Sequence, residues 1–315
     1  MKKSLIITII VVISILSVAC QGRANQVRLA TGGTAGTYYA FGSALAQILS
    51  EDTNISINVQ STGASRANIQ LIAAGEVDAA IVQNDVMDYA WRGVDLFSGE
   101  QTTSFATMAA LYAEVCQIVA NPAAGINTIA DLRGKNVSVG DAGSGVEFNA
   151  RQILDVYDIS FDDIGKQNLS FAASADALRD GKIDAFFCVA GAPTPAIIDL
   201  ATSRDIIILE VDEAAAALLI RNYPFYTRFP ITAGTYRGLN RDVMTVAVKA
   251  TLIVSSTLDE DTVYNLTKSL FENKAKIEAA HAKGTELSTS YAVEGISVPF
   301  HPGAAKYFRE IGALR

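Results

Sequence analysis

Histidine, cysteine and clustered positive charge are scarce in this sequence. Its 315 residues include two histidines (His281 and His301) and three cysteines, too few to favour a multi-ligand zinc site. Lysine and arginine number 25 against 33 acidic residues, which gives a formal net charge of −8. Nucleic-acid binding needs clustered basic side chains, and this chain has none. We therefore expect no metal, no cofactor and no nucleic-acid partner.

Half of the residues are apolar, which excludes a disordered chain. At about 150 residues per domain, the length indicates two domains, each able to bury a core.

The N-terminus has the pattern of a secretory leader. Two lysines precede the mostly apolar run Leu5–Val18, which is too short to span a bilayer comfortably. Ser17-Val18-Ala19-Cys20 resembles a bacterial lipoprotein box, so we predict a signal peptide at 1–19 and lipidation of Cys20. Ordinary cleavage after Ala19 without a lipid is the alternative.

Without residues 1–19 the net charge is about −10, because two lysines are lost. Residues 20–26 are short and polar, and we interpret them as a flexible tether. No later apolar stretch has membrane-spanning length. The mature protein is therefore expected outside the cytoplasm, in the periplasm or on the outer face of the membrane, and attached to the membrane only through the lipid.

Strands alternate with helices through short loops along most of the chain, which predicts an α/β fold with a largely parallel sheet. Phe105–Ala120 is long, apolar and extended, and could cross between two domains. Asp261–Ile277 has helical spacing and is expected to form one helix. Both halves show the same coarse order of strand, glycine-rich turn and helix.

Three loops, each placed after a strand and before a helix, are the candidate ligand site: 32–37, 61–65 and 141–145. Ligands of open α/β sheets bind beyond the carboxyl ends of the strands. Glycines allow a close backbone approach, and helix N-termini and hydroxyls offer donors, so the loops suit a small anion. Helix capping is the alternative role for each of these loops.

Arg66, the pair Tyr38 and Tyr39, and Gln83 lie in or beside these loops and are further candidates, each with a structural alternative. Arg66 could pair with a ligand carboxylate or remain solvated. One of Tyr38 and Tyr39 is expected in the core, and the other could cover the ligand. Gln83, at a strand end, could bond a ligand or only tie two loops together.

Enzyme motifs are absent or incomplete. The glycines of 32–36 lack the G-x-G-x-x-G spacing, and no Gly-Lys-Ser/Thr occurs. Gly143-Ser144-Gly145 is not a G-x-S-x-G elbow, and neither histidine is near it in sequence. We therefore expect a protein without catalytic residues.

Cys116 and Cys188 lie in two apolar strands. A disulfide between them is one expectation, because the compartment is oxidising and the strands could be neighbours. Buried free thiols are the alternative.

Several motifs, in order over nearly the whole mature chain, resemble the TAXI family, the extracytoplasmic solute-binding proteins of tripartite ATP-independent periplasmic (TRAP) transporters. They are ATGGTAGTYY (30–39), STGAS (61–65), IVQND (81–85), LRGKNVSVG (132–140) with GSG (143–145), DAFF (184–187) with GAPTP (191–195), YPFY (223–226), TVAVKA (245–250) and HPGA (301–304).

The resemblance implies a two-lobed periplasmic-binding-protein-like (type II) fold with a ligand cleft between the lobes. We place lobe 1 at 27–114 plus 210–315 and lobe 2 at 115–209. It also implies a small carboxylate ligand, such as glutamate, another amino acid or a dicarboxylate, which is delivered to a TRAP membrane permease made of fused transmembrane subunits.

Carried over residue by residue, the resemblance predicts ligand contacts from both lobes. The expected ligand-binding residues, Arg66 included from its own position, are Gly33, Thr34, Thr37, Tyr38, Ser61, Thr62, Ser65, Arg66, Gln83, Gly143, Ser144, Gly191 and Thr194.

Arg66-Ala67 departs from the family pattern, which leaves the identity of the ligand open. Two other functions remain as alternatives: a ligand-sensing module for a signalling partner, and a periplasmic enzyme on the same scaffold.

Overall fold

The computed structural model describes residues 26–315. The predicted signal peptide (1–19), the lipidation site Cys20 and all of the tether except Gln26 lie outside the described residues. Within the described part, no helix is both long and apolar enough to cross a bilayer.

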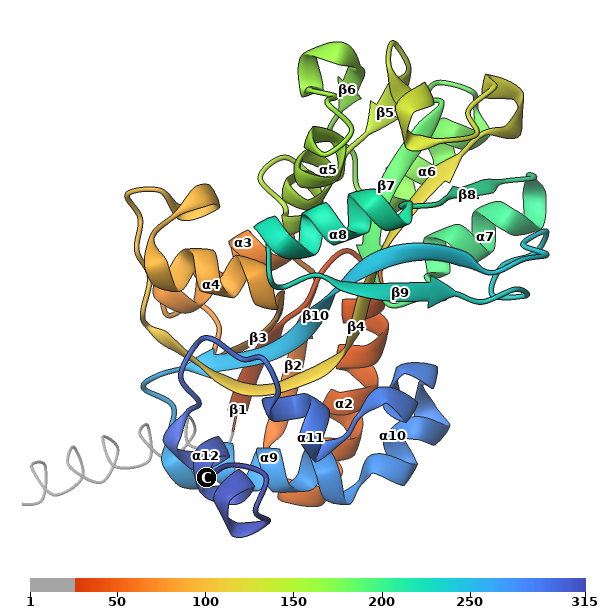
Figure 1. Ribbon diagram of the computed structural model, residues 1–315. Helices are drawn as coiled ribbons and strands as arrows, with labels where there is room; N and C mark the ends of the chain where they lie inside the picture. The colour runs from red at the N-terminus through yellow and green to blue at the C-terminus, as the bar shows by residue number, and fades with distance from the viewer. Residues whose placement is uncertain (1–25) are drawn as a thin grey trace, which may run out of the picture.

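One ten-stranded sheet runs through the whole molecule (Figure 1), in the order β2–β1–β3–β10–β4–β7–β5–β6, with β8 beside β4 and β9 beside β10. The strands are β1 (Gln26–Ala30), β2 (Ser56–Gln60), β3 (Ala79–Gln83), β4 (Phe105–Ala120), β5 (Asn136–Ser138), β6 (Gly165–Gln167), β7 (Ala185–Ala190), β8 (Ile207–Leu209), β9 (Thr227–Ile231) and β10 (Val243–Ser255).

The two halves of the sheet repeat one arrangement. In the first half, β1 pairs in parallel with β2 and β3, and β3 lies antiparallel to β10. In the second half, β5 pairs in parallel with β6 and β7, and β7 lies antiparallel to β4. This confirms the predicted α/β fold and the coarse likeness between the halves. The prediction of a largely parallel sheet is wrong, because β4 and β10 run antiparallel to all the strands beside them.

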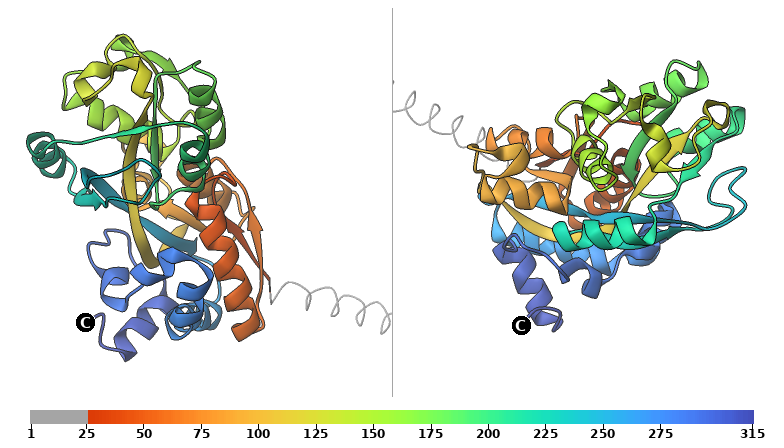
Figure 2. Two further views of the ribbon diagram at one scale, coloured as in Figure 1. Left: turned by 90° about the vertical axis from the view of Figure 1, so that its right-hand side faces the viewer. Right: turned by 45° about the horizontal axis from the view of Figure 1, so that its top comes forward.

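β4 and β10 join the halves. They pair antiparallel with each other from Val115 and Ala247 to Phe105 and Ser255, and all sixteen residues of β4 are buried. Figures 1 and 2 show α5, α6 and α7 on one side of these crossing strands and α9 to α12 on the other. The extended segment predicted at 105–120 is confirmed as the crossing strand.

Helices cover both faces of the sheet. They are α2 (Thr37–Thr53), α3 (Ser65–Ala73), α4 (Asn84–Arg92), α5 (Gly145–Asp155), α6 (Phe171–Arg179), α7 (Pro195–Ser203), α8 (Glu213–Asn222), α9 (Glu260–Glu272), α10 (Lys274–Ala280), α11 (Thr289–Val293) and α12 (Pro302–Glu310), with the 3-10 turn η5 (Ala282–Glu286).

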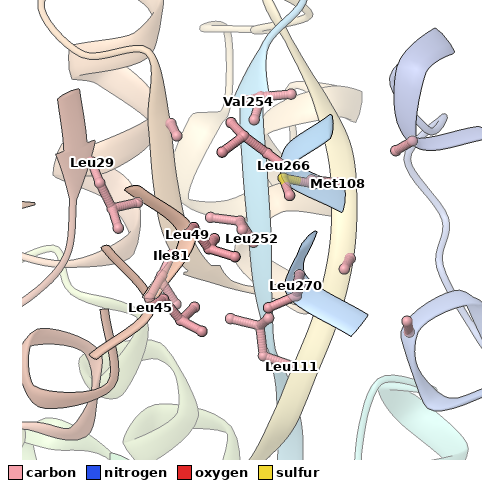
Figure 3. Packing of buried hydrophobic residues seen from close by; sticks show 14 of the residues in the cluster. Leu29, Leu45, Leu49, Ile81, Met108, Leu111, Leu252, Val254, Leu266 and Leu270 are labelled. Atoms are coloured by element: carbon pink, nitrogen blue, oxygen red, sulfur yellow. The ribbon is translucent and has the colours of Figure 1, made fainter. Parts of the chain in front are cut away.

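The core of the first half lies between the sheet and the helices α2 and α9. Figure 3 shows Leu45 and Leu49 of α2 and Leu266 of α9 around Leu252 of β10 and Met108 of β4. β1 contributes Leu29 to this core, and α12 contributes Phe308. Residues from near both ends of the described chain therefore share one core.

The predicted lobe boundary at residue 210 differs from the packing. In the structure the chain rejoins the core of the first half in the middle of β10. Ala215 and Leu219 of α8 share a core with Ile118 of the second half, and Val248 still belongs to that core. Ala250 is the first β10 residue in the core of the first half. No helix was predicted at 213–222, and α8 there keeps the chain with the second half.

The helix predicted at Asp261–Ile277 is two helices, α9 and α10, which meet at Asn273. The Asn273 side-chain amide donates to the carbonyl and hydroxyl of Ser269. A short amide that bonds to the backbone in this way competes with the helical hydrogen bonds.

The predicted disulfide between Cys116 and Cys188 is wrong, although their strands are neighbours. Cys116 pairs with Val189 and Cys188 with Gln117, so the two sulfurs project from opposite faces of the sheet. Each lies in a different core, and both are free, buried thiols.

We predict that both thiols of a protein comprising residues 26–315 resist an aromatic disulfide reagent in native buffer. Burial raises the pKa of Cys116 and Cys188, so little thiolate is available to react. Two thiols should be titrated after denaturation, and dithiothreitol should leave the melting temperature unchanged. A melting temperature that falls on reduction would contradict the assignment.

Candidate functional site

The three loops singled out in the sequence line one cavity of about 230 Å³ between the halves. The first half contributes 32–38, 61–65, Gln83 and Glu114, and the second half contributes Asp141, 144–146, 170–172, Val189 and Ala190.

Four helices, α2, α3, α5 and α6, begin at the wall of this cavity. The first N–H groups of a helix lack intrahelical partners, and each helix start carries about half a positive charge. No lysine or arginine is found among the described residues that line the cavity. Attraction for an anion would therefore come from the backbone amides of the helix starts, which suits a small anion held at short range.

Several of the predicted hydroxyls tie loops together. The Ser61 hydroxyl donates to the Gly32 carbonyl at 3.0 Å, and the Thr62 hydroxyl donates to the Thr31 carbonyl at 2.9 Å. The Ser65 hydroxyl oxygen accepts a hydrogen bond from the backbone N–H of Gln83 at 3.1 Å. These bonds hold the loop backbones in place around the cavity.

Ser144 acts as a helix cap, the alternative given for its loop. Its hydroxyl oxygen accepts the Glu147 amide N–H at 3.2 Å at the start of α5. Thr34 differs, because it is an exposed residue of the cavity wall and its hydroxyl makes no hydrogen bond to a described residue. Its hydroxyl is therefore free to meet a ligand.

Arg66 and Gly143 do not line the cavity. The Arg66 guanidinium lies 5.7 Å from the Phe97 ring centroid, and its Nη2 is 3.4 Å from Glu100 Oε2. A methyl group on Gly143 would lie 3.6 Å from Arg66 Nη1, so Arg66 reaches the second half beside the cavity. The Gly143 N–H donates to the Glu147 carboxylate at 2.6 Å.

Gly191 and Thr194 also lie behind the cavity wall. The Gly191 carbonyl accepts the Thr37 hydroxyl across the two halves, at 2.9 Å. Thr194 is fully buried, donates to the same carbonyl and accepts from the Gln117 side chain at 2.8 Å. Gly191 therefore links the two halves, whereas Thr194 holds the Gly191 carbonyl and Gln117 within the second half.

Gln83 links the halves instead of standing free in the cavity. Its side-chain amide Nε2 donates to Asn149 Oδ1 at 2.7 Å. The side-chain amide of Asn149 donates in turn to the Asp85 carboxylate at 2.9 Å and to the Tyr226 hydroxyl. Burial raises the pKa of Asp85 to about 6. The tie between loops, which was the alternative role of Gln83, is therefore present.

Glu114 is a cavity residue that the sequence analysis missed. It is 2% exposed, and the Tyr38 hydroxyl donates to its Oε2 at 2.5 Å. Burial raises its pKa well above the usual value for a glutamate. The signal was available, because Glu114 is the only charged residue in the sixteen residues of β4.

The start of α6 was missed as well. Ser170 caps this helix by accepting the Ala173 N–H, and Phe171 lies against Gly36 of the first half. β6, which precedes α6, is three residues of Gly-Lys-Gln. A segment so short and polar carries no strand pattern, so the strand–loop–helix order was not visible.

No cluster of three or more metal-ligating side chains occurs within residues 26–315. Both histidines cap helical turns: His281 Nδ1 accepts the Lys283 N–H, and His301 Nδ1 accepts the Gly303 N–H. Burial lowers the pKa of both rings.

Comparison with known proteins identifies the fold and the family. The NMT1-like family profile matches residues 29–312. PhnD1 from Prochlorococcus marinus in complex with methylphosphonate is 9% identical, with a TM-score of 0.58 over 93% of this chain and 100% of that one. The alkanesulfonate-binding protein SsuA from Xanthomonas axonopodis pv. citri, bound to MOPS, is 14% identical, with a TM-score of 0.53 over 92% and 84%.

We predict that Gly145→Ala lowers the free energy of unfolding by about 1–3 kcal/mol, because a methyl group here overpacks a buried contact. That methyl would lie 1.5 Å from Gln83 Oε1 and would break the bond from Gln83 to Asn149. Urea unfolding measures the change.

Gly33→Ala is the matched control, since a methyl group at Gly33 meets nothing within 4 Å. Equal unfolding free energies for the two variants would contradict the contact between Gln83 and Gly145.

Proposed function

We propose that this chain, which belongs to the NMT1-like family, is an extracytoplasmic solute-binding protein that captures a small anion and delivers it to a membrane permease. The observation that carries the proposal is the convergence of four helix N-termini from both halves on one cavity. In this role the protein binds and releases its ligand without making or breaking covalent bonds.

A carboxylate is the ligand that we propose for this cavity. The amides of the helix starts can donate to its two oxygens, and Thr34 adds a hydroxyl. PhnD1 in complex with methylphosphonate and SsuA bound to MOPS have similar structures, which favours a small anion as the ligand of this fold. Within carboxylates, glutamate, other amino acids and dicarboxylates remain the candidates.

The partner that we propose is a TRAP permease, on the strength of the TAXI-like motifs quoted above. Lipidation at Cys20 would tether the protein to the membrane and keep the cavity outside the cytoplasm. A permease could read the surface formed when the halves meet.

Capture would work by a shift between open and closed arrangements of the halves. The bonds from Thr37 to Gly191 and from Gln83 to Asn149 form only when the halves are together. A ligand held by helix starts of both halves binds the closed form more tightly, so its binding favours closure.

A thermal-shift screen tests the proposal. At about 100 times its dissociation constant, a ligand adds about 2.7 kcal/mol of stability. We expect at least one amino acid, oxoacid or dicarboxylate to raise the melting temperature and neutral sugars to leave it unchanged. A screen in which only sugars stabilise the protein would overturn the proposal.

Thr34→Ala should weaken the ligand-induced shift and leave the unliganded melting temperature nearly unchanged, because its hydroxyl bonds no described residue. Thr103→Ala, at an exposed position away from the cavity, is the control. Ser144→Ala should instead destabilise the unliganded protein by about 1 kcal/mol, the usual cost of a lost N-cap.

A further inference from the structure

The crossing strand β4 brings one carboxyl group to the wall of the cavity. Glu114 lines the cavity, and all but 2% of its surface is buried. A cavity that attracts anions through helix starts is an unfavourable place for a second negative charge. An ionised Glu114 would therefore weaken the binding of an anion, whereas a neutral Glu114 would not.

The hydrogen bonds of Glu114 leave one oxygen for a guest. Its Oε2 accepts the Tyr38 hydroxyl at 2.5 Å. No described residue makes a hydrogen bond to Oε1. Because Oε2 already has a donor, a proton on this carboxyl group would sit on Oε1, where it can be donated to a ligand.

Burial raises the pKa of Glu114 by more than its neighbours lower it, because only the Tyr38 hydrogen bond and the charge of Lys283 of η5 favour the carboxylate. The Lys283 Nζ also lies 2.5 Å from Glu286 Oε1, so Lys283 is paired with another carboxylate. Glu286 also faces Tyr112 and Tyr291, whose phenols are neutral because burial raises their pKa.

Two more acidic groups share this region. Asp85 of α4 adds to the rise of the Glu114 pKa, after the larger effect of burial. Asp141 lines the cavity from the second half, and its own pKa is raised by burial. Burial and these neighbouring carboxyl groups therefore favour an uncharged Glu114.

We propose that Glu114 is a specificity-determining residue that binds the ligand as the neutral acid, donating from Oε1 to an acceptor oxygen of the guest. This inference rests on the proposed function. It assigns the ligand to small carboxylates that carry a carbonyl, hydroxyl or second carboxylate at this end. Compounds with an ammonium group in that place lose the hydrogen bond and bind more weakly.

The proposal predicts how affinity depends on pH. Binding requires the protonated carboxyl group, so above the pKa of Glu114 in the unliganded protein each pH unit should weaken binding tenfold. Below that pKa the affinity should be flat. A carboxylate paired with a ligand ammonium predicts the opposite slope, with affinity rising as Glu114 ionises.

Calorimetric titration between pH 5.5 and 8.5 separates the two. The probes are three oxoacids and the amino acids with the same carbon skeletons: pyruvate and L-alanine, 4-methyl-2-oxopentanoate and L-leucine, and 2-oxoglutarate and L-glutamate. Their carboxylate and ammonium charges stay constant over this range. We expect an oxoacid to bind more tightly than its amino acid and its affinity to fall with pH only above the pKa of Glu114.

Variants identify the titrating group. E114Q keeps a donor in place of Oε1–H, so it should bind the oxoacid within a few-fold of the native affinity at low pH and lose the pH dependence. D85N should keep the pH dependence, although Asp85 has a pKa of about 6 and titrates in the same range. If E114Q does not fold, the native protein and D85N still give the slope.

The outcomes distinguish this inference from the proposed function. If no carboxylate binds at any pH, the proposed function fails and the inference with it. If carboxylates bind but the affinity rises with pH, loses its slope in D85N and not in E114Q, or is independent of pH with no preference for the oxoacid over its amino acid, only the role of Glu114 is overturned.

Discussion

The antiparallel pairing of β4 with β10 is the constraint on which the rest of the structure depends. Both strands are built mainly from apolar residues and are buried almost throughout, and each has one end in either half. Because they are the central strands of one continuous sheet, they fix the two halves close enough to share a cavity. β4, which has no other charged residue, also brings Glu114 to that cavity.

The cavity obtains its chemistry from backbone more than from side chains. Most hydroxyls of the three loops bond to neighbouring loops or cap helices, as Ser61, Thr62 and Ser144 do. These bonds hold the helix starts at the cavity wall. In the proposed function, their N–H groups would bind an anion without a lysine or arginine in the wall, so the site would be sensitive to any further negative charge.

Sequence patterns predicted the elements whose signal is local. The crossing strand at 105–120 and the loops before α2, α3 and α5 are where hydrophobic runs and glycines place them. The relation of Cys116 to Cys188 depends on strand register, which periodicity does not give. Whether Arg66, Gly191 or Gln83 faces the cavity depends on how the halves meet, and that contact is formed by residues far apart in the sequence.

The order of the chain through the two cores has a consequence for biosynthesis. The second core is built from one continuous stretch, which begins in β4 and ends in β10. The first core combines Leu29 and Leu45 with Leu266, Leu270 and Phe308, so it stays incomplete until the last helix has emerged. During synthesis or export the second half can fold while the first half still exposes its apolar sheet, and a chain that ends prematurely would keep that surface open to aggregation and proteolysis.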